Sequence, residues 1–444
     1  MNIYNDTTIA ALATPAGEGG IAIIRLSGDK AESILSQAFR KKGKKWESHR
    51  LYYGHAVDAD GGIIDEAMAV LMRAPHSYTR EDVAELHCHG GSAVAEKLLD
   101  RLMQLGAVPA QPGEFTKRAF LNGRIDLSRS EAVMSLIRAD SDAARRAAIR
   151  ELEGGVTSFV KQCRDRLTKL LSLIEASNDY PDEIDEPATA EQVHRESAEI
   201  AAFLRENADP DKARLVTGGV SVVLSGRPNA GKSSLLNALT GTERAIVTDI
   251  PGTTRDVLTE HMTIGTLKIE LSDTAGQHET GDAIEAMGVE RAKTAQRNAD
   301  IVLIVIDASE PLTEEDRRLL KEKDERSIVV CTKTDRPVQT YIGADVMVSS
   351  VTGEGIDELL KLIRKKAGAD RLSENMLTGR RQIECALRAA EALERGSEAA
   401  ISGMPLDMAA ADIWEARSAL GEITGEDARE SVIDAVFSNF CVGK

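Results

Sequence analysis

Between residues 220 and 240 the sequence combines a glycine-rich turn with a lysine and a serine whose spacing suits phosphate chemistry. The turn reads Gly226-x4-Gly231-Lys232-Ser233, which is the P-loop pattern. Backbone N–H groups of such a turn can surround phosphate oxygens, and the N-terminus of the following helix adds positive potential. Lys232 would neutralise the β- and γ-phosphates, and the Ser233 hydroxyl would be a ligand of Mg²⁺. The sequence therefore predicts a nucleoside triphosphate site between a strand over 220–225 and a helix over 232–240.

Four short stretches after the P-loop indicate guanine as the base. Gly252–Asp256 offers a threonine that could complete the Mg²⁺ shell, and Asp273–Gly276 offers a carboxylate for Mg²⁺ and an amide that could sense the γ-phosphate. Thr332–Asp335 ends a predicted strand, and its carboxylate could accept both N1–H and N2–H of guanine, a donor pair that adenine lacks. Ser349-Ser350 could offer a backbone N–H to guanine O6. These motifs together predict a GTPase.

Two side chains compete for the hydrolytic role, and the sequence leaves the choice open. Gln277 directly follows Asp273-Thr-Ala-Gly276, where Ras-like GTPases keep the glutamine that orients the attacking water. Glu285 lies eight residues further along at the start of a predicted helix, where the helix dipole alone would also favour an acid. Lys232 is the third catalytic candidate, because its ammonium offsets negative charge on the phosphates.

The elements that must position these residues alternate strand and helix between 216 and about 368. Strands are predicted over 220–225, 257–264, 267–273, 301–307, 327–332 and 345–349, and helices over 232–240, 284–298, 312–323 and 356–367. The second and third strands should pair as an antiparallel hairpin, and the others should be parallel with right-handed crossovers. This is a doubly wound sheet whose ligand sits at the carboxyl edge of the strands.

The flanking regions have other patterns. Residues 1 to about 120 read as an α/β unit, and the regions from about 116 to 215 and from about 372 to the end read as helical, so one helical domain would be interrupted by the P-loop domain. The expected domains are 1–118, 119–215, 216–370 and 371–444. Expected details are strands over 20–26, 67–72 and 82–87, helices over 92–105, 128–150, 156–176, 190–207, 375–400, 406–421 and 427–440, a turn at 112–115 that closes the first unit, an acidic loop over 181–187 and a linker at 209–211.

Composition narrows the class of protein. A chain of 444 residues should form several domains. The net charge of −17 argues against a broad cationic surface for nucleic acid, so an RNA partner would need a local basic patch or a second protein. No apolar run approaches the ~20 residues of a membrane span, and five scattered cysteines fit a reducing cytoplasm.

The motifs as a set resemble the MnmE (TrmE) family of tRNA-modification GTPases. The resemblance is carried by the P-loop region from Gly226 to Asn237, by Thr248-Asp-Ile-Pro-Gly-Thr-Thr-Arg-Asp256 and by Asp273-Thr-Ala-Gly276. Outside the P-loop domain it is carried by Ala13-Thr-Pro-x-Gly17, Glu85-Leu-x-x-His89-Gly-Gly91, Pro112-Gly-Glu-Phe115 and the closing Phe440-Cys-Val-Gly-Lys444. These outer motifs separate the MnmE family from Era- or Der-like GTPases.

The resemblance implies a homodimer joined through N-terminal domains that bind a one-carbon derivative of tetrahydrofolate, 5-formyl- or methylene-tetrahydrofolate. It also implies a heterotetramer with an FAD-dependent MnmG-type partner. Together they would add an aminomethyl or carboxymethylaminomethyl group at C5 of the wobble uridine of certain tRNAs. The protein would be cytoplasmic, with no membrane association.

The resemblance also implies residue roles. Glu285 would be the general acid/base, Ser233 and Thr254 would bind Mg²⁺, and K⁺ would replace an arginine finger. The K⁺ positions are Asn229, Thr248, Ile250 and Thr253, and the folate positions are Arg25, Glu85, Arg124 and Lys444. The whole GTP site comprises Asn229, Ala230, Gly231, Lys232, Ser233, Ser234, Thr248, Asp249, Ile250, Pro251, Gly252, Thr253, Thr254, Asp273, Thr274, Ala275, Gly276, Thr332, Lys333, Thr334, Asp335, Ser349 and Ser350.

Three residues depart from the family pattern. Thr332 stands where asparagine is usual, Gln277 where an apolar residue is usual, and Arg124 where lysine is expected; an arginine keeps the charge but changes the hydrogen-bond geometry. Two other functions compete with the main hypothesis: a ribosome-assembly GTPase of Era or Der type, and a nucleotide-dependent switch that only binds other proteins.

Overall fold

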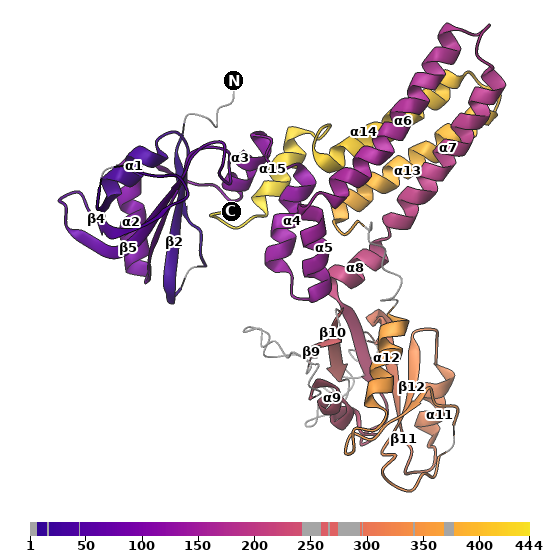
Figure 1. Cartoon of the computed structure of the whole chain (residues 1–444). Helices are drawn as coiled ribbons and strands as arrows, with labels where there is room; N and C mark the ends of the chain where they lie inside the picture. The colour runs from indigo at the N-terminus through magenta and orange to yellow at the C-terminus, as the bar shows by residue number, and fades with distance from the viewer. Residues whose placement is uncertain are drawn as a thin grey trace. The chain divides into compact units, whose positions relative to one another are not determined.

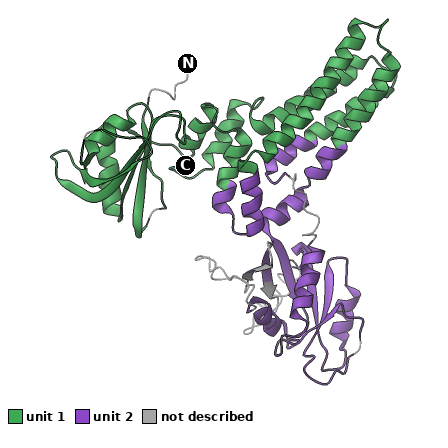
Figure 2. Ribbon diagram, in the orientation of Figure 1, with its two compact units in different colours: residues 1–134, 151–201, 388–444 green, residues 135–150, 202–387 purple. Residues whose placement is uncertain are grey.

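The computed structural model describes residues 7–241 except 16 and 44, then 259–264, 267–273, 294, 296–340, 342–367 and 377–444. Figure 1 labels its helices and strands. Two units are distinguished in Figure 2: the first contains residues 1–134, 151–201 and 388–444, and the second contains residues 135–150 and 202–387. Each is described by itself below.

The N-terminal part of the first unit is a seven-stranded sheet in the order β3-β4-β5-β6-β2-β1-β7. Its neighbours pair antiparallel except β1 and β7, which are parallel. The sequence predicted only β2, β5, β6 and α2 of this part. Its elements are β1 (Ile9–Leu12), β2 (Gly19–Ser27), α1 (Ala31–Ala38), β3 (Phe39–Lys41), β4 (Leu51–Val57), β5 (Ile63–Met72), β6 (Val83–Gly90), α2 (Ser92–Gln104) and β7 (Val108–Pro109).

The two faces of this sheet differ. Alternate residues such as Ile24, Ala69 and Leu86 are buried in one cluster with Leu35 of α1 and Leu98 of α2. The residues between them point to the other face, because side chains alternate along a strand. On that second face Tyr53 is 64% exposed, Ile21 59% and Met68 36%. The helices α1 and α2 thus cover one face, and the other presents apolar side chains to solvent.

Helices follow from residue 114 to residue 218. They are α3 (Glu114–Leu121), α4 (Leu127–Arg138), α5 (Asp142–Leu152), α6 (Gly155–Asp179), α7 (Glu186–Asn207) and α8 (Pro210–Gly218). The C-terminal helices are α13 (Arg380–Ile401), α14 (Leu406–Thr424) and α15 (Glu430–Ser438). Within the first unit α6 packs along α14, as Figure 1 shows, and His194 of α7 lies 2.8 Å from the Ser397 hydroxyl of α13.

Four predicted boundaries were wrong, and capping residues explain three of them. The turn at 112–115 is the start of α3, because Gly113 at φ 69° is its N-cap. The single helix expected over 128–150 is two helices, since the Ser141 hydroxyl accepts from the Ala144 N–H and starts α5. The linker at 209–211 is the start of α8, where the Asp209 side chain accepts from two backbone N–H groups. The acidic loop ends earlier than expected, because α7 begins at Glu186 and not near 190.

The chain's C-terminus returns to the N-terminal sheet within the first unit. Phe120 of α3 packs with Phe437 and Phe440, and α15 lies beside α3 in Figure 1. The Gly113 N–H donates to the Cys441 carbonyl at 3.4 Å. A Cβ on Gly443 would lie 2.2 Å from the Leu12 carbonyl oxygen, so only glycine permits this approach to β1. The last residues are therefore held against β1 and β2.

The second unit contains a six-stranded sheet in the order β13-β12-β11-β8-β10-β9. The predicted hairpin is confirmed, because β9 and β10 pair antiparallel, and the other neighbouring pairs are parallel. The residues of the predicted helix 284–298 lie outside the described ranges except for 294 and 296–298. The elements are β8 (Val220–Ser225), α9 (Lys232–Thr240), β9 (Thr259–Ile264), β10 (Leu267–Asp273), β11 (Ile301–Asp307), α11 (Glu314–Lys321), β12 (Ser327–Thr332), β13 (Val346–Met347) and α12 (Ile356–Lys366).

Helices lie on both faces of this sheet. Leu235 of α9 and Leu359 of α12 share one buried cluster with Val222, and Leu319 of α11 packs against the cluster on the other face with Val302. The doubly wound arrangement is thus confirmed. The elbow between α4 and α5 also contacts this sheet, since Lys268 of β10 pairs with Asp140 at 2.5 Å. In the described part of the chain, no helix is long and apolar enough to cross a membrane.

Candidate functional site

The predicted P-loop connects β8 to α9, which is the strand-turn-helix context that the motif requires. A Cβ on Gly226 would lie 2.5 Å from the Val305 carbonyl oxygen, so the loop can pass β11 only with glycine there. Asn229 and Gly231 both have positive φ, at 63° and 95°, and Gly231 is the N-cap of α9. The loop therefore turns back on itself immediately before a helix N-terminus, which favours anion binding.

Lys232 is buried within this loop. Its ammonium donates to the Gly226 carbonyl at 2.6 Å and to the Arg227 carbonyl at 2.9 Å. Ser233 and Ser234 are exposed in the first turn of α9, and Ala230 is buried. The positive charge of Lys232 is thus held by the carbonyls of the loop whose backbone would surround the phosphates of a nucleotide.

The predicted guanine motif lies at the end of β12 and contacts the P-loop. The Thr332 hydroxyl donates toward the Ala230 carbonyl at 2.5 Å and lies 3.2 Å from the Ile306 carbonyl. Lys333, at φ 58°, donates to the Asn229 carbonyl at 2.8 Å and to Asp307 at 2.7 Å. The structure therefore brings the base-side and phosphate-side motifs together, as predicted from their positions at strand ends.

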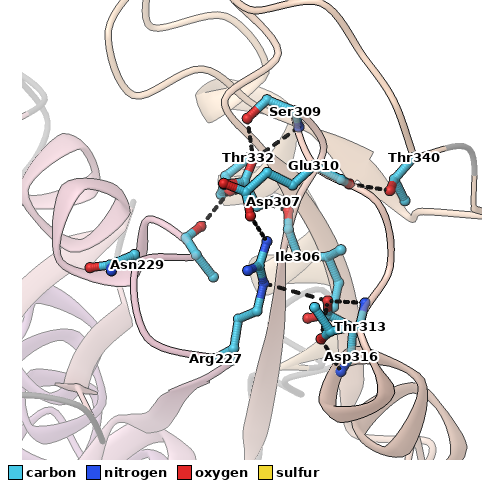
Figure 3. A network of polar contacts seen from close by, with 12 residues as sticks. Arg227, Asn229, Ile306, Asp307, Ser309, Glu310, Thr313, Asp316, Thr332 and Thr340 are labelled. Carbon is cyan, nitrogen blue, oxygen red and sulfur yellow. Dashed lines mark hydrogen bonds and ion pairs between the residues drawn. The ribbon is translucent and has the colours of Figure 1, made fainter.

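Asp307 at the end of β11 anchors Lys333 and was not predicted as a site residue. Burial raises the pKa of its carboxyl, but hydrogen bonds donated by Lys333 and Ser309 outweigh burial, so the pKa lies below the usual range. Figure 3 shows Asp307 accepting from Ser309 next to Thr332. The carboxylate consequently remains charged near neutral pH. Its place at a parallel strand's carboxyl end was the available sequence signal.

The acceptor predicted for guanine, Asp335, is exposed and held by one neighbour. The hydroxyl of buried Ser349 donates to Asp335 Oδ1 at 2.8 Å. The Thr334 N–H also donates to the Val348 carbonyl at 3.4 Å, which joins the two base-side loops. Ser350 is partly exposed beside Ser349. These contacts fix the carboxylate at the edge of the sheet that carries the P-loop.

Arg227 connects the P-loop to the segment that follows β11. Its guanidinium donates to Glu310 at 2.6 Å, and its Nε lies 3.5 Å from an oxygen of Asp316, which is 1% exposed (Figure 3). The same Asp316 oxygen accepts from the backbone and hydroxyl of Thr313 in a capping box at the start of α11. The nearby acids raise the pKa of Arg227. The P-loop is thus tied to α11 by a largely buried ion pair.

Several predicted GTP-site residues lie outside the described residues. These are Thr248, Asp249, Ile250, Pro251, Gly252, Thr253, Thr254, Thr274, Ala275, Gly276, Gln277 and Glu285. The backbone of Asp273 is described at the end of β10, next to β8 and therefore beside the P-loop strand. The predicted Mg²⁺ and K⁺ sets are thus represented by Ser233 and Asn229.

The four predicted folate residues lie in the first unit, and two of them, Arg25 and Arg124, contact Tyr78. Arg25 of β2 donates to Glu85 of β6 at 2.9 Å, and its second guanidinium nitrogen lies 3.5 Å from the carbonyl oxygen of Gly443, the neighbour of Lys444. The Arg25 guanidinium lies 5.7 Å from the Tyr78 ring centre, and that of Arg124 lies 4.7 Å from it. Three distant parts of the sequence thus meet at one end of β2.

The Glu85 carboxylate is doubly paired on the exposed face of the sheet. Its second oxygen lies 3.1 Å from His87 Nε2. The hydrogen bond with His87 and the charge of Arg25 hold the pKa of Glu85 below its usual range, although burial acts in the opposite direction. Glu85 is therefore a charged acceptor that could receive N–H groups of a heterocycle.

Comparison with known proteins identifies the family. A sequence model described as the GTP-binding protein TrmE N-terminus matches residues 8–124, and one described as the MnmE helical domain matches residues 127–441. The chain is 41% identical to the tRNA modification GTPase MnmE of Lactobacillus helveticus, over 98% of each chain. It belongs to the MnmE family.

Other relatives agree. The tRNA modification GTPase MnmE of Moorella thermoacetica is 42% identical, over 99% of this chain and 100% of that one. Among solved structures, the G domain of the T. maritima FeoB iron transporter is 32% identical over 33% of this chain and 98% of its own, with a TM-score of 0.26. The family assignment rests on the whole-length MnmE relatives and the two family models, and not on this partial likeness. The resemblance predicted from the motifs is confirmed.

Besides Asp307, three residues of this MnmE-family chain were missed by sequence reasoning. Arg227 lies in the motif but has no sequence signal for its partners in α11. Tyr78 lies in a loop between β5 and β6, and nothing in the sequence relates it to Arg25 or Arg124. Asp316 reads only as a first-turn acid of a helix.

Proposed function

We propose that this chain is a GTPase that acts in tRNA modification. The observation that carries the proposal is the whole-length identity of 41–42% to MnmE relatives, which covers the N-terminal, helical and P-loop regions alike. The contacts of Lys232, Thr332 and Lys333 support it, because they assemble the phosphate and base motifs at one sheet edge. Matches to both TrmE and MnmE models favour it over an Era- or Der-like GTPase.

Hydrolysis is proposed to use two cations. Mg²⁺ would be held by Ser233 and Thr254, and K⁺ by Asn229, Thr248, Ile250 and Thr253. A fixed cation beside the β/γ bridge would offset the charge that develops in the transition state. Glu285 is proposed as general acid/base through a bridging water, with Gln277 as the alternative.

The N-terminal domains are proposed to dimerise and to bind a tetrahydrofolate one-carbon derivative. The apolar exposed face of the sheet, with Tyr53, Ile21 and Met68, supports dimerisation. Arg25 and Glu85 lie on that same face, so ligand and dimer would share it. Arg124 and Lys444 complete the proposed folate set, and the contact between Arg25 and Gly443 supports the inclusion of the C-terminus.

The proposed reaction needs a second protein. An FAD-dependent MnmG-type partner would join the dimer in a heterotetramer and share the contact with tRNA, which suits a chain of net charge −17. The group would be added at C5 of the wobble uridine. The cytoplasm is the proposed compartment, and the absence of a disulfide among the five cysteines supports it.

The first test is GTP hydrolysis by the full chain in KCl and in NaCl at equal ionic strength. We expect K⁺ to raise the rate at least about tenfold, which corresponds to about 1.4 kcal/mol of barrier. The Asn229→Gly variant should lose this acceleration, because glycine accepts the positive φ of 63° but has no side-chain ligand. Binding of a fluorescent GDP by the variant serves as the control for an intact P-loop.

Equal rates in the two salts would contradict the K⁺ mechanism and direct attention to Gln277. If the wild-type chain hydrolysed GTP in neither salt, the proposed GTPase activity would be wrong.

A further inference from the structure

An open cavity of about 520 Å³ is lined in part by Tyr78, whose ring lies 5.7 Å from the Arg25 guanidinium, and the proposed function leaves this cavity unassigned. It shares Tyr78 and Arg124 with the proposed folate residues. His49, His76 and Arg80 add three nitrogen-bearing side chains, while Met72 and Pro75 add an apolar wall. No carboxylate is among its lining residues, in contrast to the acidic chain as a whole. Its volume is typical of a small-molecule site.

Backbone strain marks this cavity as a built site. Among the described residues, four that are not glycine have positive φ: His49 at 62°, Arg80 at 62°, Asn229 at 63° and Lys333 at 58°. Asn229 and Lys333 belong to the candidate nucleotide site. His49 and Arg80 both line the cavity. Such conformations cost free energy, persist where neighbouring contacts enforce them, and cluster at ligand sites.

Neighbouring contacts do enforce the conformation of Arg80. The Asn122 side chain donates to the Thr79 carbonyl at 2.7 Å, and Arg80 donates back to the Asn122 carbonyl at 2.9 Å. Arg124 donates to the Tyr78 carbonyl at 3.1 Å and stacks on the Tyr78 ring. These bonds cross-link the loop 78–80 to the turn 122–124. Two guanidinium groups are therefore held at the cavity, and each uses only part of its five N–H donors in these bonds.

The cavity and the Arg25–Glu85 pair offer different groups to a ligand. At one end, the Glu85 carboxylate can accept N–H groups, which the amino-oxo ring of a pterin presents. At the other end, Arg80 and Arg124 can donate paired hydrogen bonds to carboxylates, which the glutamyl end of a folate presents. Tyr78 contacts both groups, because its ring centre lies 5.7 Å from the Arg25 guanidinium and 4.7 Å from that of Arg124. The Glu85 charge is already paired with Arg25. Arg80 and Arg124 have no carboxylate among the residues that line the cavity, so the anionic tail of a folate would be drawn towards these arginines.

We propose that this cavity binds the γ-linked glutamyl carboxylates of a reduced folate and that Arg80 selects for polyglutamylated forms. The inference rests on the proposed folate binding and adds to it the ligand's anionic tail. Each added glutamate contributes one carboxylate. The affinity for the folate should therefore rise with tail length until the free N–H donors of Arg80 and Arg124 are all used.

The test compares 5-formyl-tetrahydrofolate with its tri-γ-glutamate by isothermal titration of the full chain. The wild type should bind the triglutamate at least about tenfold more tightly, and the preference should shrink as salt is raised. The Arg80→Asn variant should bind both forms with nearly equal affinity, because asparagine tolerates positive φ and removes the cation. Arg40→Asn is the matched control: Arg40 is an exposed arginine of the same sheet that also donates to a backbone carbonyl, that of Gly61 at 2.8 Å. It should keep the preference.

The outcomes separate the two proposals. Tight binding of both forms with equal affinity by the wild type, or an unchanged preference in Arg80→Asn, would overturn the role of this cavity and leave folate binding intact. Binding of neither form by the wild type would overturn both. If Arg80→Asn does not fold, Arg80→Gly replaces it, since glycine adopts the same φ without strain.

Discussion

Thr332, which departs from the asparagine expected from the family resemblance, connects the base motif to the P-loop through a single hydroxyl. A hydroxyl carries one proton, so the Ala230 carbonyl at 2.5 Å is its principal acceptor and the Ile306 carbonyl at 3.2 Å is secondary. Thr332 is buried, and the bond reaches the residue directly before Gly231. The base motif therefore supports the P-loop through its first residue, whereas recognition of guanine would remain with Asp335.

We expect Thr332→Val to weaken nucleotide binding. Valine has nearly the same shape but leaves the Ala230 carbonyl without its donor, which costs about 1–3 kcal/mol for a buried group. Dissociation of a fluorescent GDP should accelerate about tenfold or more in stopped-flow measurements. Thr332→Ser keeps the hydroxyl and should release the nucleotide close to the wild-type rate. If serine and valine behaved alike, packing and not the hydrogen bond would explain the effect.

At the scale of elements, the ion pair of Arg227 joins the P-loop to the start of α11. Its two acids differ in burial, since the side chain of Asp316 is 1% exposed and that of Glu310 is 55% exposed. Arg227 Nε lies 3.5 Å from Asp316 Oδ2, the oxygen that also accepts from Thr313, so the guanidinium places a positive charge beside this buried carboxylate. The contribution of Arg227 to stability should therefore come mainly from its pairing with the buried Asp316.

We predict unequal effects of the two obvious substitutions. Arg227→Ala should destabilise the region by about 2 kcal/mol, because it leaves a buried carboxylate uncompensated. Glu310→Ala should cost only about 0.5 kcal/mol, since an exposed partner contributes little. Hydrogen exchange followed by mass spectrometry can localise the effect, with faster exchange expected over 220–231 and 301–320 in Arg227→Ala alone. If hydrogen exchange became equally faster in both variants, Glu310 and not Asp316 would be the partner through which Arg227 holds the P-loop.

The central strands of the P-loop sheet, β8, β11 and β12, were predicted to the residue because they are buried on both faces, whereas β13 covers only 346–347 of the predicted 345–349. Runs such as Ile301–Asp307 and Ser327–Thr332 are continuous and β-branched, which gives a clear signal. The N-terminal sheet was predicted less completely, since its exposed face carries tyrosine, methionine and isoleucine that blur the alternation. Helix breaks were missed where a cap decides the boundary, as at Ser141 and Asp209. Capping depends on one side-chain bond and leaves little trace in the periodicity.

The nucleotide site and the site around Tyr78 also differ in how far the sequence could predict them. The P-loop and guanine motifs are local in sequence, so their residues and chemistry could be named before the structure. The arrangement around Tyr78 joins β2, β6, the loop 78–80, the turn 122–124 and the C-terminus. Residues so far apart are related only by the fold, and the family resemblance alone suggested four of them. Tyr78 and Arg80 emerge from the contacts.

At the scale of the whole molecule, the exposed sheet face requires an explanation. Tyr53 pairs across β4 and β5 with Met68, and Met68 pairs across β5 and β6 with His87, which faces Ile23 of β2. A row of mainly apolar side chains, interrupted by His87, thus runs over the strands. A second copy of this chain is the partner proposed above. Its own sheet face would cover the same row, as a twofold interface requires. Burial of these side chains would then supply the association free energy.

We therefore expect Tyr53→Glu to dissociate the dimer. A carboxylate buried without a partner in an apolar interface costs several kcal/mol, and about 3 kcal/mol raises Kd roughly a hundredfold. Sedimentation velocity of the full chain at micromolar concentration should show a dimer for the wild type and a monomer for the variant. Ile401→Glu is the control, because Ile401 is similarly exposed, at 58%, but lies at the end of α13. A Tyr53→Glu chain that remained dimeric would place the interface elsewhere. A monomeric variant that still hydrolysed GTP but had lost K⁺ activation would indicate that pairing of the N-terminal domains brings the two GTPase domains together.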